Sequence, residues 1–170
     1  HTKSRASTFF GDGIAAHVSM ADPVCPSLSG ALYKAALSAG ATVHKDATYI
    51  CMEGPQFSSR AESEIYRKWG VDVIGMTNMP EAKLAREAEI CYVTMALVTD
   101  YDCWHPDHDH VTVDIIVSNL VQNAKTAQQA IADAVGRIPG ERTCECADAL
   151  KFAVITRPDS IPAQAKRDLA

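Results

Sequence analysis

Hydrophobic residues recur every three or four positions along much of this chain, and this spacing is typical of amphipathic helices. The clearest case is the stretch 112–138, whose apolar positions would share one face of a long helix. Gly40 follows a shorter stretch, at a position where glycine commonly closes a helix. The pattern predicts five helices, over 27–39, 59–69, 78–88, 112–138 and a last short one over 147–155.

The helix predicted from residue 59 has the most specific start signal. Ser59 is followed three positions later by Glu62. In such a capping box, the serine side chain and the glutamate carboxylate bind backbone N–H groups that have no partner within the helix. We therefore expect the helix to begin directly after Ser59 and to end before Gly70.

Apolar segments too short for further helices lie between these elements. The segments 41–52 and 71–75 are predicted as strands, and the run 90–98 is predicted as a buried central strand. Because strands alternate with helices, we expect an α/β fold with a mixed, twisted sheet and flanking helices. The length of 170 residues fits one domain, with 1–143 as its main part and 144–170 as a C-terminal helix and tail of the same domain.

Composition and charge narrow the range of partners. The net charge is −5 and no basic run occurs, so nucleic acid is not an expected partner. Charged or polar residues interrupt every apolar stretch before it reaches the length of a membrane span. The first residues are polar and lack the apolar core of a secretion signal, so a cytoplasmic location is expected.

Six cysteines raise the question of disulfides and metals. Cys144 and Cys146 are close enough for a strained local disulfide, a redox pair or two metal ligands. Free cysteines otherwise behave as small hydrophobic residues, and four lie in core-like segments, at positions 25, 51, 91 and 103. No second Cys or His pair has zinc-ligand spacing, and the polar loop 105–110 is irregular. We predict no metal, and the disulfide state stays open.

Two carboxylates, Asp100 and Asp102, directly follow the run 90–98. In open α/β sheets, ligands bind beyond the carboxyl ends of the strands. Acids delivered there can accept hydrogen bonds and protons from a polar heterocycle. On spacing alone, an ordinary solvated turn is the commoner explanation of such a pair.

Four longer stretches carry a resemblance that goes beyond pattern. They are EGPQFSSRAES (53–63), WGVDVIGMT (69–77), PEAKLAREA (80–88) and ALVTDYDCW (96–104). Together they resemble the 5′-methylthioadenosine phosphorylases, which belong to the trimeric purine nucleoside phosphorylases, and the resemblance covers about residues 1–138. It implies a nucleoside phosphorylase-like fold with the amino-terminal part missing. It also implies a homotrimer, inorganic phosphate as co-substrate and no other cofactor.

The resemblance assigns chemistry to the two acids. The implied reaction is phosphorolysis of 5′-methylthioadenosine to adenine and 5-methylthioribose 1-phosphate. Asp100 would act at purine N7 as the general acid. Asp102 would accept from the 6-amino group and so select adenine over 6-oxopurines, whose oxygen would face it as a second acceptor.

Further binding residues are implied in the same way. Thr77 would bind phosphate, and His17 would reach the 5′ pocket of a neighbouring subunit. Residues implied to contact the base, ribose or methylthio group are Phe57, Ser58, Met76, Thr99, Tyr101, Val113, Ile116 and Val117. On residue type alone, Phe57 fits a core aromatic, and His17 fits a polar surface residue.

Several alternatives stay open at this point. A phosphorylase of different 5′ specificity fits the same motifs, and a hydrolase would use water in place of phosphate. In the family, a glycine-containing phosphate loop, an Arg-His pair and a hydroxyl residue precede the segment that corresponds to this chain. We therefore expect an amino-terminal half as a partner, without which the chain would be an inactive or binding-only fragment.

Overall fold

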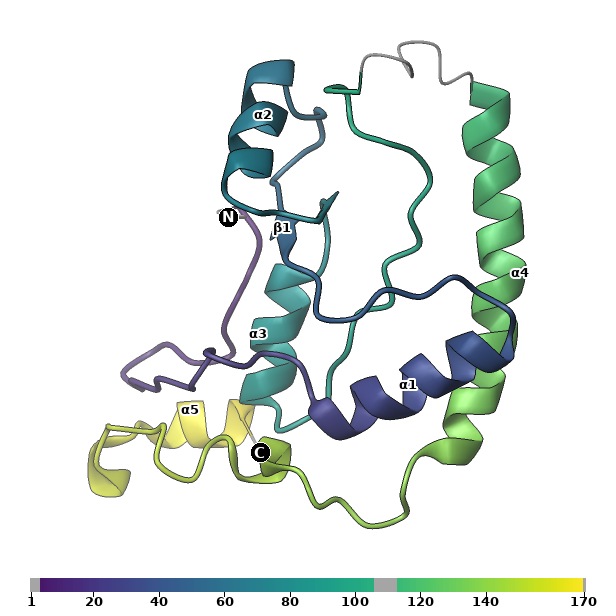
Figure 1. Ribbon diagram of the computed structural model, residues 1–170. Coiled ribbons are helices and arrows are strands. Elements are labelled where there is room, and N and C mark those ends of the chain that lie inside the picture. The colour runs from purple at the N-terminus through teal and green to yellow at the C-terminus, as the bar shows by residue number, and fades with distance from the viewer. Residues whose placement is uncertain (1–3, 106–112, 170) are drawn as a thin grey trace.

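The structure of this chain is a computed structural model that describes residues 4–105 and 113–169. Figure 1 shows helix α4 along one side of the molecule, with α1 crossing its lower half and the other elements on the opposite side. In chain order, the elements are α1 (Pro26–Ser38), β1 (Tyr49–Cys51), α2 (Arg60–Lys68), β2 (Val73–Gly75), α3 (Met79–Glu87), α4 (Val113–Arg137), η2 (Glu145–Asp148), η3 (Pro158–Ser160) and α5 (Ala163–Asp168).

Strands β1 and β2 form a small parallel sheet, with Ile50 opposite Ile74 and Cys51 opposite Gly75. Parallel neighbours need a crossover connection, which α2 provides here. Gly75 is required in this register, because a Cβ there would lie 1.8 Å from the hydroxyl of Tyr49. The expected α/β character is confirmed, but the described sheet is two-stranded and parallel, not mixed.

Helix α2 begins where the sequence predicts. The Ser59 hydroxyl accepts from the Glu62 backbone N–H at 3.3 Å, and the Glu62 carboxylate accepts from the Ser59 backbone N–H at 2.8 Å. The helix ends at Lys68, before Gly70, which has a φ of +76°. Both ends of this helix are therefore determined by side chains within or next to it.

Replacing Ser59 by alanine is expected to lower the free energy of unfolding by about 1 kcal/mol, because an N-cap acceptor is lost. Hydrogen bonds from Ser59 hold the pKa of Glu62 below its usual value. The stabilising effect of this pair is thus present above the usual glutamate pKa and is lost as pH falls through the lower folded-state pKa. Urea unfolding across pH measures both effects. Ser118→Ala, at an exposed position within α4, is the control.

Helices α1 and α4 pack through small side chains. Ala31, Ala35 and Ala36 of α1 are buried, and so are three alanines of α4, namely Ala127, Ala130 and Ala134. The apolar stripe predicted over 112–138 is only partly confirmed as a core face. Within the described residues, other parts of the chain bury only alanines of this stripe. Its larger apolar side chains are about half or more exposed, namely Val117, Leu120, Val121, Ile131 and Ile138.

The predicted central strand over 90–98 is wrong for the part of the chain that the structure describes. The segment has no regular secondary structure and pairs with no other strand there. Its backbone carbonyls are bound individually: Tyr92 accepts from the Cys25 backbone N–H at 2.8 Å, and Val98 accepts from the Asn123 side chain at 2.9 Å. An extended apolar run becomes a strand only when a neighbouring strand supplies a hydrogen-bonding edge.

The helix predicted over 147–155 is also wrong. The 3-10 turn η2 is followed by a turn, and Val154 forms a β-bridge with Ala16. The backbone N–H of His17 donates to Ala153 and that of Ile155 donates to Ala15, both at 2.9 Å. These long-range bonds replace the local helical ones. Among the described helices, none has the length and apolar character needed to cross a membrane.

Candidate active site

Asp102 is the best-fixed carboxylate among the predicted site residues. Its Oδ1 accepts from the Cys103 backbone N–H at 2.8 Å, and its Oδ2 accepts from the Ser63 hydroxyl and, at 3.3 Å, from the Ser58 hydroxyl. The hydroxyl oxygens of Ser58 and Ser63 are 3.0 Å apart. We call Ser58, Ser63 and Asp102 the serine–aspartate cluster. It connects the loop before α2, the helix itself and the segment after residue 98.

Ser63 is the inner member of this cluster, since only 2% of its surface is exposed. It lies one turn into α2, so the capping box that begins the helix also determines where its hydroxyl points. A buried hydroxyl that donates to a carboxylate orients the carboxylate strongly, because charged acceptors form the stronger hydrogen bonds. The half-buried Asp102 is therefore held ready to accept from a ligand.

Asp100 lies in a different environment from Asp102. It is exposed, and its Oδ2 accepts from the Thr99 hydroxyl at 2.6 Å. The carbonyl of Thr99 accepts in turn from the side chain of Asn119 on α4 at 2.7 Å. Helix α4 thus holds the backbone immediately before Asp100, while α2 holds Asp102.

A second part of the site is the loop after β1, which lies against the end of β2. Arg5 donates to the carbonyl of Glu53 at 2.8 Å and also to the carbonyl of Met76. Gly54 has a φ of +69°, and a Cβ there would lie 2.8 Å from the sulfur of Met76. The positive φ favours glycine at position 54, Met76 packs closely against it, and Arg5 joins the two backbone segments.

Thr77 lies at the end of β2 beside Tyr49. Burial raises the pKa of the Tyr49 phenol above its ordinary value, although hydrogen bonds to Thr77 act in the opposite direction. Thr77 itself is exposed. The Thr77 side chain is therefore held by the phenol of Tyr49 on the neighbouring strand, while Thr77 stays accessible to solvent.

Two predicted base-binding aromatic residues are open to solvent. Phe57 is 87% exposed and Tyr101 is 58% exposed. The alternative that Phe57 is a core aromatic is wrong within the described chain, because no core forms around it. Tyr101 packs edge-on against Trp104 with ring centroids 6.0 Å apart, and the Arg67 guanidinium lies 3.6 Å from the Trp104 centroid.

The remaining predicted residues are not brought to this cluster. His17 is exposed, and its backbone binds the C-terminal segment at Ala153. Val117 is half exposed near the start of α4. The side chains of Val113 and Ile116 lie outside the described residues, as does most of the polar loop 105–110. Their predicted roles stay predictions.

Sequence reasoning missed three residues that shape the site, namely Arg5, Tyr49 and Ser63. Ser63 is four positions after the N-cap, so it lies on the same side of α2 as Ser59, and this spacing could have indicated its direction. Arg5 and Tyr49 gave no such signal. Their contacts are with residues distant in the sequence; Arg5, for example, is 71 residues from Met76.

Comparison with known proteins identifies the family of this chain. Residues 1–136 match the sequence profile of the phosphorylase superfamily. The chain belongs to this family. The expected family resemblance is therefore confirmed, and the motifs around Phe57, Met76 and Asp102 lie within the matched range.

Individual relatives share the family membership at high identity. The chain is 61% identical over 166 residues to the S-methyl-5′-thioadenosine phosphorylase of Geobacter sulfurreducens, and 58% identical over 168 residues to that of Koribacter versatilis. These alignments cover 98% and 99% of this chain. The chain spans 58% of the length of each of these two relatives.

Solved family structures show that the fold is shared. A crystal structure of methylthioadenosine phosphorylase from an antarctic soil metagenomic library superposes with a TM-score of 0.92, at 52% identity, and covers 99% of this chain and 60% of that one. Methylthioadenosine phosphorylase from Schistosoma mansoni in complex with adenine gives a TM-score of 0.77 at 30% identity, covering 88% of this chain and 60% of that one. The nucleoside phosphorylase fold is thus established for the part of the domain that this chain represents.

Proposed function

We propose that this chain provides the base-binding part of a phosphorylase that converts 5′-methylthioadenosine and phosphate to adenine and 5-methylthioribose 1-phosphate. The observation that carries the proposal is the carboxylate of Asp102, held by Ser63 and Ser58 next to the exposed Asp100. The relatives whose names specify this reaction share 58% to 61% of its residues over almost all of its length.

Asp102 supports selection of an amino-substituted purine. An ionised carboxylate offers only acceptors, and its orientation is fixed from behind by two hydroxyls and one backbone N–H. A 6-amino group can donate to the remaining lone pairs. A 6-oxo group would place an acceptor against an acceptor, which leaves buried polar atoms unpaired.

Asp100 supports departure of the base. As the glycosidic bond lengthens, negative charge develops on the purine, and an ionised neighbour would repel it. Asp100, acting as a carboxylic acid, shares its proton with N7 and removes that repulsion. The hydrogen bond from Thr99 occupies Oδ2 and leaves Oδ1 available to the ring.

Phosphate binding is the less complete part of the site. Thr77 is exposed near the end of β2, and its hydroxyl and backbone N–H would bind an anion in place of the Tyr49 phenol that they contact here. We propose that the other phosphate ligands belong to the part of the longer relatives that this chain does not match. We also propose that the protein acts as a homotrimer, in which His17 reaches a neighbouring subunit. Light scattering of this chain joined to the unmatched portion of a longer relative, as described below, tests this assembly.

The function is tested with two preparations. One is this chain, and the other is this chain joined to the portion of the Geobacter sulfurreducens relative that the alignment leaves out. Release of adenine from 5′-methylthioadenosine is followed with and without phosphate. The proposal expects phosphate-dependent release by the joined protein. Release without phosphate would indicate a hydrolase, and preference for a 5′-hydroxyl nucleoside would overturn the proposed substrate.

Replacing Phe57 by alanine is expected to raise the KM for 5′-methylthioadenosine about 10-fold with little change in thermal stability. The side chain is 87% exposed, so its loss removes few internal contacts, whereas stacking on a purine contributes on the order of 1–3 kcal/mol. Steady-state kinetics and thermal melting separate the two effects. Phe152→Ala, at an 89% exposed phenylalanine in the C-terminal segment, is the matched control. A lower melting temperature with an unchanged KM would contradict the stacking role.

A further inference from the structure

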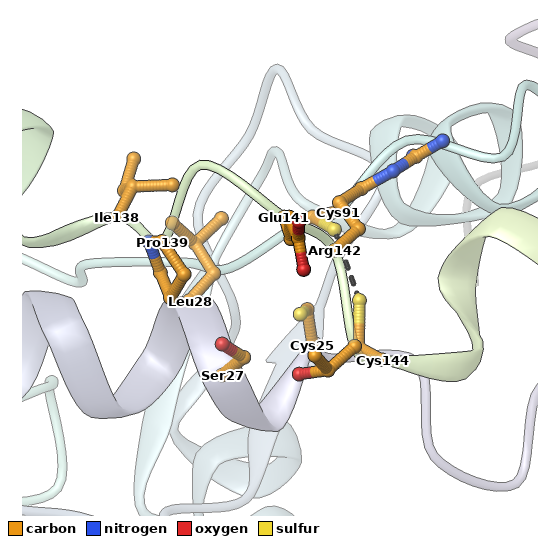
Figure 2. A pocket seen from close by; sticks show the side chains of 10 residues that line it. Cys25, Ser27, Leu28, Cys91, Ile138, Pro139, Glu141, Arg142 and Cys144 are labelled. Atoms are coloured by element: carbon orange, nitrogen blue, oxygen red, sulfur yellow. Dashed lines mark hydrogen bonds between the residues drawn. The ribbon is translucent and has the colours of Figure 1, made fainter.

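Four of the six cysteines meet at one point, away from the serine–aspartate cluster. The Sγ atoms of Cys25, Cys91, Cys144 and Cys146 all lie within 4.8 Å of one another. We call them the four-thiol cluster. Cys25 and Cys146 are buried and the other two are half-buried. Figure 2 shows the thiols of Cys91 and Cys144 pointing toward each other, 3.4 Å apart, with Cys25 beside them.

The backbone around the four-thiol cluster holds the thiols together independently of their sulfur atoms. The Cys25 backbone N–H donates to the carbonyl of Tyr92, which brings the start of α1 next to Cys91. Glu89 anchors the other side: its carbonyl accepts from Arg142 at 2.7 Å, and its carboxylate accepts from the Leu150 backbone N–H at 2.9 Å. The loop that carries Cys144 and Cys146 is thereby tied to the segment just before Cys91.

We propose that the four-thiol cluster is a structural zinc site. In a tetrahedral Zn²⁺ site the Zn–S distance is about 2.3 Å, which places the sulfur atoms about 3.8 Å from one another. The Sγ atoms of Cys91 and Cys144 are 3.4 Å apart, and no two Sγ atoms of the cluster are more than 4.8 Å apart. Binding an ion therefore requires the sulfur atoms to move by about an ångström or less. Four thiolates with no oxygen or nitrogen ligand favour Zn²⁺ among the common divalent ions.

Binding releases the thiol protons, so that Zn²⁺ and four cysteines give a tetrathiolate of net charge −2 with no change in oxidation state. Zn²⁺ coordinates cysteine as the thiolate, so binding of the ion to the four-thiol cluster is favoured as pH rises.

The position of the proposed zinc site indicates a structural role. It would join the start of α1, the segment after α3 and the loop after α4, which hydrogen bonds at Cys25 and Glu89 also connect. A site with four protein ligands leaves no open position for substrate or water. The zinc would therefore stabilise the frame around the helices without taking part in the proposed reaction.

The sequence prediction of no metal rested on the absence of a second cysteine pair at zinc-ligand spacing. The structure supplies that pair from Cys25 and Cys91, which are distant in sequence and adjacent in space. The pairing was not visible in the sequence, because it depends on how the segment after α3 lies against the start of α1.

The test uses the full chain, produced without a histidine tag in zinc-containing medium and purified with a thiol reductant. Elemental analysis is expected to find about one zinc per chain. Titration with a thiol reagent should find the four cluster thiols protected until a mercurial displaces the metal. Replacement by Co²⁺ should give the visible and near-ultraviolet bands of a tetrahedral thiolate site.

Variants locate the site. Cys25→Ser and Cys144→Ser are expected to lose the bound zinc, whereas Cys51→Ala and Cys103→Ala, which lie outside the cluster, should retain it. If the cluster variants do not fold, the Co²⁺ spectrum of the unmodified chain decides by itself. Protein that folds without metal and shows six free thiols when it is denatured overturns the proposal. So do intramolecular disulfides among these cysteines in cells, or iron in place of zinc.

Discussion

Asp102→Asn is expected to reduce kcat/KM for 5′-methylthioadenosine by about 10²-fold or more and to shift preference toward 6-oxopurine nucleosides. Asparagine keeps one side-chain oxygen that can still accept from Ser63, although the nitrogen in place of Oδ1 loses the hydrogen bond from the Cys103 backbone N–H. Its amide nitrogen then takes the place of the second acceptor. An NH₂ group facing the 6-amino group of adenine leaves two donors unpaired, at about 1–3 kcal/mol each.

The change in selectivity is the decisive measurement for Asp102→Asn. Turnover of adenine and 6-oxopurine nucleosides is compared in the same preparation, so that loss of folded protein cancels in the ratio. Ser63→Ala is the matched positional control: it keeps the carboxylate and removes a hydrogen bond that orients it. That variant should lower turnover of both substrates without inverting the preference. Asp46→Asn makes the same charge change at an exposed position and should have no effect. Unchanged selectivity in Asp102→Asn would contradict the role of this carboxylate.

Asp100→Asn is expected to lower kcat by about 10²- to 10⁴-fold, the range typical for loss of a general acid. The amide still accepts from the Thr99 hydroxyl, so the local structure is retained. It cannot transfer a proton to purine N7 as the base departs. Because the exposed side chain makes only this contact within the described residues, folding should be unaffected.

The dependence on the leaving group distinguishes acid catalysis by Asp100 from a purely structural role. A methylthioriboside with a leaving group that needs no protonation should be turned over almost as fast by Asp100→Asn as by the unmodified protein. Pre-steady-state measurements on both substrates, in the joined protein, report the chemical step directly. An equal loss for both substrates would show that Asp100 acts in binding or folding and not as the proton donor.

Local signals predicted the helices well. The capping box at Ser59 and the glycine at position 40 locate the boundaries of α2 and α1 within one or two residues. Those signals act within a turn of helix, so the nearby sequence contains all of the information. The predicted strand over 90–98 failed because an apolar run cannot specify its partner. Likewise, the helix predicted over 147–155 does not form because backbone groups in this segment bond to residues 15–17, which are distant in the sequence.

The motifs around Phe57, Met76 and Asp102 were sufficient, by themselves, to indicate the family, because they are contiguous and long. The boundaries of α1, α2, α3 and α4 followed from periodicity and capping. Only the tertiary structure decided that Ser63 orients Asp102, that Arg5 joins the loops of Glu53 and Met76, and that four separate cysteines converge. Ser63 and Asp102 are 39 residues apart in the sequence, and Arg5 is 71 residues from the Met76 carbonyl that it binds. Such proximity depends on how the elements pack, and no short stretch of sequence encodes it.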